Sequence, residues 1–312
     1  MNLAHLHLLL NHFPTIGMLV GLGVFVTAIA GKSDDLKRAS LVIFFGIALL
    51  SIPTFATGTA AQLALAHTRE VSKTAIETHE TAAFIALGFM ELTGALAWLG
   101  LWQYRRVSRV PRGTLAAILV TGLVTFGLMS RAANVGGDIR HPEIRAGIDA
   151  VETAPTKPPL ARVIGDAMAN LKWGWPASET VHFIGLCLLF GVVLVVDLRM
   201  LGFMPGIPFS TLHRLLPWGV LGFGINVVTG ILFFIGAPPD FYVNNSAFIW
   251  KLALILVAGA NALYFTVFEQ AWTVDAGDTP SMAAKVAAAS GILLWTGVIF
   301  CGQMLPFFGH SF

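Results

Sequence analysis

The chain has little charge and little cysteine. Charged residues make up 12% of its 312 residues, about half the share usual in soluble proteins, whereas 56% are apolar. A soluble fold could not bury this much apolar surface, so the composition excludes an ordinary soluble enzyme and a disordered chain. The two cysteines, Cys187 and Cys301, form no C-x-x-C or C-x-x-C-H pattern. This excludes a disulfide-rich domain, a zinc knuckle and covalently attached c-type haem. The net charge of +2 gives no sign of nucleic acid binding.

Long apolar runs dominate what is present. Each run has roughly 20 or more residues, the length an α-helix needs to cross the hydrocarbon core of a bilayer. The sequence therefore predicts an all-α integral membrane protein with eight transmembrane helices, embedded in the lipid bilayer. The predicted spans are 8–31, 39–62, 80–103, 114–134, 177–201, 212–236, 247–270 and 284–306.

Basic residues predict the orientation of these spans. Lysine and arginine are concentrated in the short loops after the first, third, fifth and seventh spans, for example Lys32 and Arg105. The positive-inside rule places such loops in the cytoplasm, so both termini are predicted to be periplasmic. Segment 135–176, rich in proline and charge, is predicted to be a long periplasmic loop. It divides the chain into 1–134 and 177–312, each predicted to be a four-helix transmembrane bundle.

The two halves repeat an ordered set of residues. In each half a His-Phe pair opens the first span, a Thr-Gly pair lies in the second, and one basic residue follows 21 positions after that glycine. Each half has an even number of spans, which predicts a parallel internal repeat rather than an inverted one. The repeated set is His12, Gly58 and His79 in the first half, and His182, Gly230 and Lys251 in the second.

The predicted topology places eight of the nine histidines on the periplasmic side. His12 and His79 lie at matching depth on the first and third spans, as two axial ligands of a haem b iron do in a helical bundle. His5 lies one heptad before His12 and is a candidate to pair with His141 around a second group. His182 is the corresponding candidate in the second half. The sequence thus predicts one or two haem b groups.

Acidic and basic residues inside the spans indicate a further polar site. Glu91 lies near the middle of the third span and is a candidate for a proton path or a quinone site. Glu179 and His182 share a helix face, and with Lys251 they are predicted to form a polar pocket. The alternatives are a neutral structural acid, a snorkelling lysine and histidines that only bind water or lipid headgroups. A zinc or copper site has less support, because no H-x-x-x-H pair or Cys-His cluster occurs.

Three motifs of the first half resemble an uncharacterised bacterial family of four-helix membrane proteins. The resemblance covers about half the chain and implies b-type cytochrome character, a bacterial inner membrane location and a role for the three histidines it includes. The motifs are His12-Phe13-Pro14, then Thr57-Gly58 with His79-Glu80, and Gly136-Gly137 followed by His141. The second half resembles another uncharacterised bacterial membrane family, distantly similar to copper-resistance membrane proteins. That resemblance rests on Glu179, His182, Asp197, Arg199, Trp250-Lys251 and Asn261.

These observations predict a membrane-bound b-type cytochrome that relays electrons between the quinone pool and a periplasmic redox partner. The partner would be a c-type cytochrome or a dehydrogenase subunit, and the chain would be an electron-transfer protein or oxidoreductase subunit rather than a stand-alone enzyme. Oligomers are compatible with the sequence. Two other functions stay open: a permease that handles copper or another cation, and a membrane anchor subunit without a cofactor.

Overall fold

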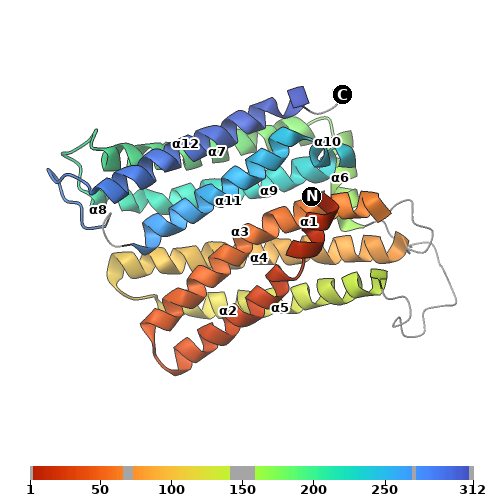
Figure 1. The fold of residues 1–312 in the computed structure, drawn as a ribbon, viewed down its shortest axis with the longest axis horizontal. Helices are drawn as coiled ribbons and strands as arrows, with labels where there is room; N and C mark the ends of the chain where they lie inside the picture. The colour runs from red at the N-terminus through yellow and green to blue at the C-terminus, as the bar shows by residue number, and fades with distance from the viewer. Residues whose placement is uncertain (1–2, 66–72, 141–158, 269–271, 309–312) are drawn as a thin grey trace. The chain divides into compact units, whose positions relative to one another are not determined.

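The computed structural model describes residues 3–65, 73–140, 159–268 and 272–308, and these residues form helices and no strand (Figure 1). The prediction of an all-α chain is confirmed for them. The elements are α1 (Leu3–Leu10), α2 (Phe13–Ala30), α3 (Asp34–Leu65), α4 (Lys73–Val107), α5 (Arg112–Arg140), α6 (Leu160–Asn170), α7 (Gly174–Leu201), α8 (Phe209–Leu212), the 3-10 turn η2 (His213–Leu215), α9 (Leu216–Gly236), α10 (Pro239–Val243), α11 (Ser246–Val267) and α12 (Met282–Phe308).

Within the described residues, eight helical segments are long and apolar enough to cross a membrane, which confirms the predicted number. Most extend beyond the predicted spans, because charged residues continue a helix past its apolar part. Asp34 and Asp35 occupy the first turn of α3, and Arg105 and Arg106 the last turn of α4. The eight segments are Leu3–Ala30, Asp34–Leu65, Lys73–Val107, Arg112–Ile139, Gly174–Leu201, Phe209–Gly236, Ser246–Val267 and Met282–Phe308.

The first of these segments is not one straight helix. A turn at Asn11 and His12 separates α1 from α2, and Pro14 lies in the first turn of α2, where its missing N–H is tolerated. Figure 1 shows α1 turned away from the line of α2, and α1 packs on α3. The break therefore changes which side chains of α1 face the neighbouring helices.

Local signals explain where other helices begin and end. The fully buried side chain of Asn245 caps α11: its oxygen accepts from the N–H of Ala247 at 3.0 Å and of Phe248 at 3.3 Å. Its amide also donates to the carbonyl of Leu305 at 2.8 Å, which ties the start of α11 to the end of α12. Gly202 ends α7 with a φ of 99°, a left-handed conformation that glycine adopts without strain.

The helices fall into two compact units. Unit 1 comprises 1–98 and 111–167, and unit 2 comprises 99–110 and 168–312. The division falls inside α6, within the segment 135–176 that was predicted to be a loop. Part of this segment is helical, because α5 continues to Arg140 and α6 is a helix of 11 residues.

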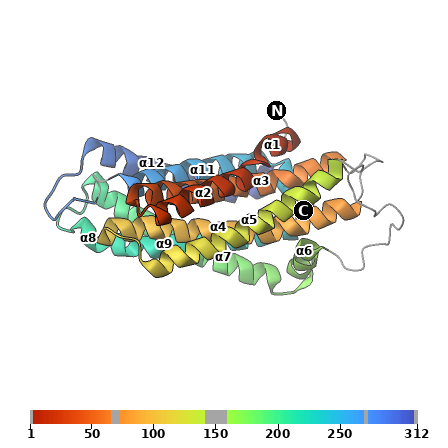
Figure 2. The same ribbon diagram turned by 90° about the horizontal axis from the view of Figure 1, so that it is seen from below.

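In unit 1, α2 packs against α3 and α5, and these helices run alongside α4 (Figure 2). Small residues let the helices approach closely: a Cβ atom on Gly94 of α4 would collide with the side chain of Ala48 on α3. Two fully buried hydroxyls, of Thr93 on α4 and Thr125 on α5, lie 3.0 Å apart and share a hydrogen bond. Unit 1 is thus held by close helix contacts and by hydrogen bonds inside the apolar core.

In unit 2, α7 packs against α9 and α12, and α11 packs against α12. The backbones of α7 and α9 meet at Gly185 and Gly222, where a Cβ atom on either glycine would lie 3.0 Å or less from a carbonyl oxygen of the other helix. The end of α4 belongs to this unit because Trp102 Nε1 donates to the carbonyl of His213 at 3.0 Å. Arg105 Nε likewise donates to the carbonyl of Thr266 at 3.0 Å.

Candidate functional site

A histidine of α1 reaches the core of unit 1. The Nδ1 atom of His7 lies 2.9 Å from the carbonyl oxygen of Thr54 and 3.3 Å from the hydroxyl oxygen of Thr57, both on α3. The Thr57 hydroxyl itself donates to the carbonyl of Pro53 at 2.8 Å, so towards His7 its oxygen can only accept. A Cβ atom on Gly58 would lie 3.4 Å from the His7 ring. The helical turn of α3 that contains Thr57 and Gly58 thus holds this imidazole in place and forms its seat, the surface on which the ring packs.

His79 of α4 is held in the same way by α5. Its Nδ1 atom lies 2.9 Å from the carbonyl oxygen of Ala132. A Cβ atom on Gly136, one turn further along α5, would lie 3.0 Å from the Cε1 atom of His79. His7 and His79 are both partly buried, and they are close enough to interact electrostatically. The structure therefore brings together one histidine from α1 and one from α4.

The hydrogen bonds fix the tautomer of both rings. A carbonyl oxygen only accepts, so Nδ1 of His7 and of His79 must each carry the proton. In the neutral ring the lone pair is then on Nε2. An N–H donated to a backbone carbonyl is also the usual outer partner of a histidine that ligates a metal, because it sets the ring orientation and makes the free nitrogen more basic. The pair can therefore offer two oriented nitrogen ligands.

This arrangement differs from the predicted pairing of His12 with His79. His12 is exposed at the turn between α1 and α2, where it precedes the first residue of α2. Because the turn breaks the helix, His7 rather than His12 points toward α3. His5 is also exposed on α1, and its predicted partner His141 lies outside the described residues.

Unit 2 holds a histidine in the same way as unit 1 holds His7. The Nδ1 atom of His182 on α7 lies 2.7 Å from the hydroxyl oxygen of Thr229 on α9. The Thr229 hydroxyl donates to the carbonyl of Ile225 at 2.7 Å, so Nδ1 of His182 must be the donor. Its Nε2 atom is therefore also unprotonated. The edge of the Phe233 ring, 5.4 Å between centroids, covers one side of this imidazole.

Lys251 of α11 takes the place that His79 has in unit 1. It interacts electrostatically with His182 and with Cys301, and a Cβ atom on Gly302 of α12 would lie 3.5 Å from its Nζ atom. Within the described residues no carboxylate forms an ion pair with Lys251. Glu179 is exposed, and within the described residues no ion pair joins Glu179 to Lys251 or His182. Of the predicted pocket, His182 and Lys251 come together and Glu179 does not join them.

The two sites define the internal repeat in space. The histidine precedes the threonine that receives its N–H by 50 positions in unit 1 and by 47 in unit 2. From that threonine to the basic residue of the third long helix there are 22 positions in both units, Thr57 to His79 and Thr229 to Lys251. The counterpart of His182 is thus His7, which sequence spacing alone did not identify. The repeated Thr-Gly pair does not single it out, because His12 precedes Thr57 by 45 positions and His7 by 50, on either side of the 47 positions from His182 to Thr229.

Glu91 lies apart from these pairs, deeper in unit 1. The hydroxyl of Ser51 on α3 donates to Glu91 Oε1 at 2.9 Å and also contacts the carbonyl of Ala48 at 2.7 Å. The carboxyl group is partly buried between α3 and α4. Its position fits a structural hydrogen bond as well as a proton-binding role.

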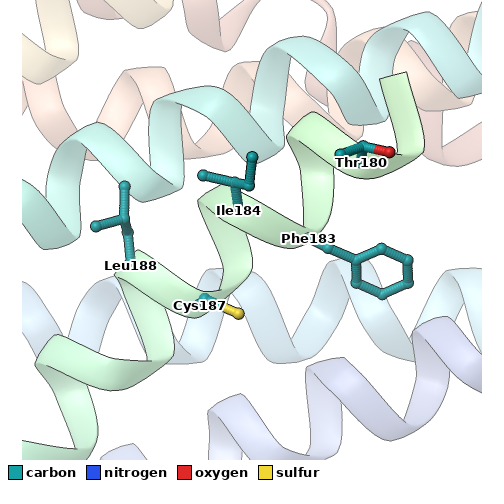
Figure 3. A pocket seen from close by; sticks show the side chains of 5 residues that line it. All are labelled: Thr180, Phe183, Ile184, Cys187 and Leu188. Carbon is teal, nitrogen blue, oxygen red and sulfur yellow. The ribbon is translucent and has the colours of Figure 1, made fainter. Parts of the chain in front are cut away.

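An apolar hollow of about 520 Å³ runs along α7 (Figure 3). Its lining comes from successive turns of one face of this helix, the face opposite His182: Thr180, Phe183, Ile184, Cys187 and Leu188. At the same end of unit 2, α10 carries Tyr242, which packs against Phe234 and Phe248. Burial raises the pKa of the Tyr242 phenol to about 12, so this group stays neutral.

The described residues contain no group of three or more His, Cys, Asp and Glu side chains that could hold a metal ion. No protein-family model matches the chain, and neither a curated protein nor a solved structure is significantly similar to it. The family resemblances of the two halves therefore stay predictions.

Proposed function

We propose that this chain is a membrane-bound b-type cytochrome in which His7 and His79 would hold the haem. One observation carries the proposal: these two imidazoles of unit 1 lie within electrostatic range of each other, and each donates its Nδ1 proton to a backbone carbonyl. Two protein ligands are sufficient for haem, because the porphyrin supplies the other four. The donor set of unit 1 fits this group.

The surrounding residues support the same chemistry. Haem would supply an iron that cycles between its ferric and ferrous states. Thr54 and Ala132 orient the imidazoles through their carbonyl groups. Gly58 and Gly136 leave the ring edges uncovered, since a side chain at either position would crowd them. The apolar helices around the pair keep water away and lower the local dielectric constant.

In this proposal the two units are four-helix bundles of a bacterial inner membrane protein, with both termini and the haem near the periplasmic face. The loops rich in lysine and arginine support this orientation. The chain would pass electrons between a membrane quinol and a periplasmic partner, a c-type cytochrome or a dehydrogenase subunit. It would act as an electron-transfer protein or oxidoreductase subunit rather than as a stand-alone enzyme.

The test is the optical spectrum of the purified full chain, oxidised and then reduced with dithionite, with haem counted by the pyridine haemochrome method. We expect a sharp reduced α-band of b type. His7→Leu and His79→Leu should each abolish it, whereas His12→Leu, the matched control, should leave it unchanged.

Two outcomes would contradict the proposal. A colourless protein from cells supplied with haem would favour a metal-handling permease or a cofactor-free anchor subunit. If His12→Leu lost the α-band and His7→Leu kept it, the haem ligand would be His12 and not His7. Copper uptake by cells that express the chain would separate the permease from the anchor.

A further inference from the structure

The carboxyl group of Asp197 is buried in a membrane-spanning helix of unit 2 without a partner. Asp197 lies on α7, four residues before the helix ends at Leu201, and 8% of its surface is exposed. Within the described residues Asp197 forms no ion pair and no hydrogen bond. A buried carboxylate without a partner loses its hydration and gains no interaction in return, so the ionised form is strongly disfavoured at this position.

Arg199, the nearest basic residue in the sequence, does not neutralise Asp197. The Arg199 side chain is fully buried and is directed at two backbone carbonyls. Its Nε atom donates to the carbonyl of Ile207, and its Nη2 atom donates to the carbonyl of Asp275 at 2.8 Å. Two positions on an α-helix are about 200° apart around its axis, so Asp197 and Arg199 point to different sides of α7.

The ionisable residues of the surrounding helices do not neutralise Asp197 either. The helix α7 packs against α8, α9 and α12, and α11 packs against α12. The helices α8 and α9 carry no ionisable side chain. Among the residues that the structure describes, no ionisable group of α11, α12 or η2 interacts electrostatically with Asp197. These groups are Lys251, Tyr264, Lys285, Cys301, His213 and Arg214.

A glycine makes the space beside the carboxyl group. A Cβ atom on Gly291 of α12 would lie 2.5 Å from Asp197 Oδ2 and 3.2 Å from Asn261 Nδ2, which comes from α11. Asp197 and Asn261 therefore approach the same point of α12, which packs against both of their helices (Figure 1). The Nδ2 atom of Asn261 also donates to the carbonyl of Ala287 at 3.1 Å. Polar atoms of three membrane-spanning helices thus meet beside the carboxyl group.

These neighbours favour a proton over a metal cation. The atom of Asn261 beside Gly291 is an amide nitrogen, which donates hydrogen bonds and does not ligate a cation. The carbonyl of Ala287 already accepts from that amide. A protonated carboxyl group, in contrast, is neutral and has an oxygen that can accept from an amide donor.

We propose that Asp197 is a proton-binding site of unit 2, which holds one proton in the folded chain and exchanges it with the aqueous side on which α7 ends. Binding converts the carboxylate into a neutral carboxylic acid, and release restores the charge. Four residues of α-helix rise about 6 Å, so a proton has a short path from that end of α7. The site goes beyond the proposed haem function, because all of its residues belong to unit 2.

Dicyclohexylcarbodiimide tests whether Asp197 carries the proton. This apolar reagent enters the bilayer and reacts with a protonated carboxylic acid. The proton moves to a carbodiimide nitrogen, the carboxyl oxygen adds to the central carbon, and the adduct rearranges to a stable N-acylurea without losing any group. The full chain in phosphatidylcholine nanodiscs is treated at neutral pH, and peptide mass spectrometry locates the adduct. We expect it on Asp197 and not on Asp35, whose side chain is 92% exposed.

Two variants and two matched controls test the assignment. Asp197→Asn has the shape of the protonated acid but cannot react, so the adduct at this position should be lost while the chain folds normally. Gly291→Ala crowds Asp197 Oδ2 and should slow the labelling. The controls Asp35→Asn and Gly191→Ala should be labelled at Asp197 like the unchanged chain, since no atom lies within 4 Å of the Cβ position of Gly191. Size-exclusion profiles and circular dichroism check that each variant folds.

Infrared spectra measure the release of the proton. Raising the pH should remove the carbonyl stretch of one protonated carboxylic acid from the spectrum of the unchanged chain, and this component should be missing in Asp197→Asn. An ionised carboxylate without a partner is destabilising, so alkaline pH should lower the thermal unfolding midpoint of the unchanged chain more than that of Asp197→Asn.

Three results would overturn the inference. A folded chain without an adduct at Asp197 would mean that the carboxyl group is ionised. Protection of Asp197 by sodium ions at constant pH would make the site a cation site. An infrared band of Asp197 that stays until the chain unfolds would make the residue a permanently neutral structural acid, which does not exchange its proton.

Discussion

Units 1 and 2 hold a histidine in the same way but place a different residue opposite it. In unit 1 His7 is seated on Thr57-Gly58 and lies within electrostatic range of His79. In unit 2 His182 is seated on Thr229 and lies within electrostatic range of Lys251. The comparison teaches that the repeat keeps the position of the histidine and changes the residue that accompanies it, His79 in one unit and Lys251 in the other. Two imidazoles suit a metal centre, whereas an imidazole and an ammonium group repel a cation.

The two seats also differ in what accepts the Nδ1 proton. His7 has two acceptors, the carbonyl of Thr54 at 2.9 Å and the hydroxyl of Thr57 at 3.3 Å. His182 has the hydroxyl of Thr229 at 2.7 Å as its hydrogen-bond acceptor. We therefore expect the orientation of His182 to depend on its threonine more strongly than that of His7 does.

The largest effect is expected from giving unit 1 the residue of unit 2. His79→Lys replaces one imidazole by an ammonium group, which carries no lone pair, and the b-type spectrum should disappear. Reduced-minus-oxidised spectra and pyridine haemochrome assays measure the change, and circular dichroism checks the helix content. An unaltered α-band would show that His79 is not a ligand.

The reverse exchange should produce a gain. Lys251→His places a second imidazole opposite His182, whose Nε2 lone pair is already available. Haem content should rise from one to two per chain. A haem content that stays at one would mean that the two seats differ in more than this residue.

A smaller effect is expected from adding one methyl group beside His79. In Gly136→Ala the new Cβ atom would lie 3.0 Å from His79 Cε1, so the ring must shift by a few tenths of an ångström. Disturbing an outer partner of a metal ligand weakens metal affinity by about 10–100-fold, and we expect the lower end of that range. Gly137→Ala is the matched control, since no atom lies within 4 Å of its Cβ position. The haem that each variant retains on dilution in detergent measures the effect. Equal haem loss from Gly136→Ala and Gly137→Ala would contradict the prediction.

The smallest effect concerns stability. Thr229→Val removes the acceptor of the His182 N–H, and leaving such a donor unsatisfied should lower the free energy of unfolding by about 1 kcal/mol. Thr57→Val should cost less, because the carbonyl of Thr54 still accepts from His7. Thermal unfolding in detergent followed by circular dichroism compares the variants. A larger loss for Thr57→Val would reverse the proposed difference between the seats.

The architecture was accessible from the sequence because it depends on composition over long windows. Runs of about 20 apolar residues specify membrane-spanning helices, since the bilayer leaves no other way to satisfy the backbone of a single segment. His79 and Lys251 were identified because a conspicuous Thr-Gly pair precedes each by the same interval. The helix α6 was missed, because proline and charge in segment 135–176 indicated a loop.

The choice among His5, His7 and His12 was decided only by the tertiary structure. All three lie within eight positions at the start of the chain, and a continuous helix would have brought His5 and His12 onto one face. The turn at Asn11 and His12 ends that periodicity, so the packing of α1 on α3 alone determines which ring faces the core. The sequence determined that histidines gather at this end of unit 1. The packing of α1 selected His7, because helical spacing cannot be counted across a break in the helix.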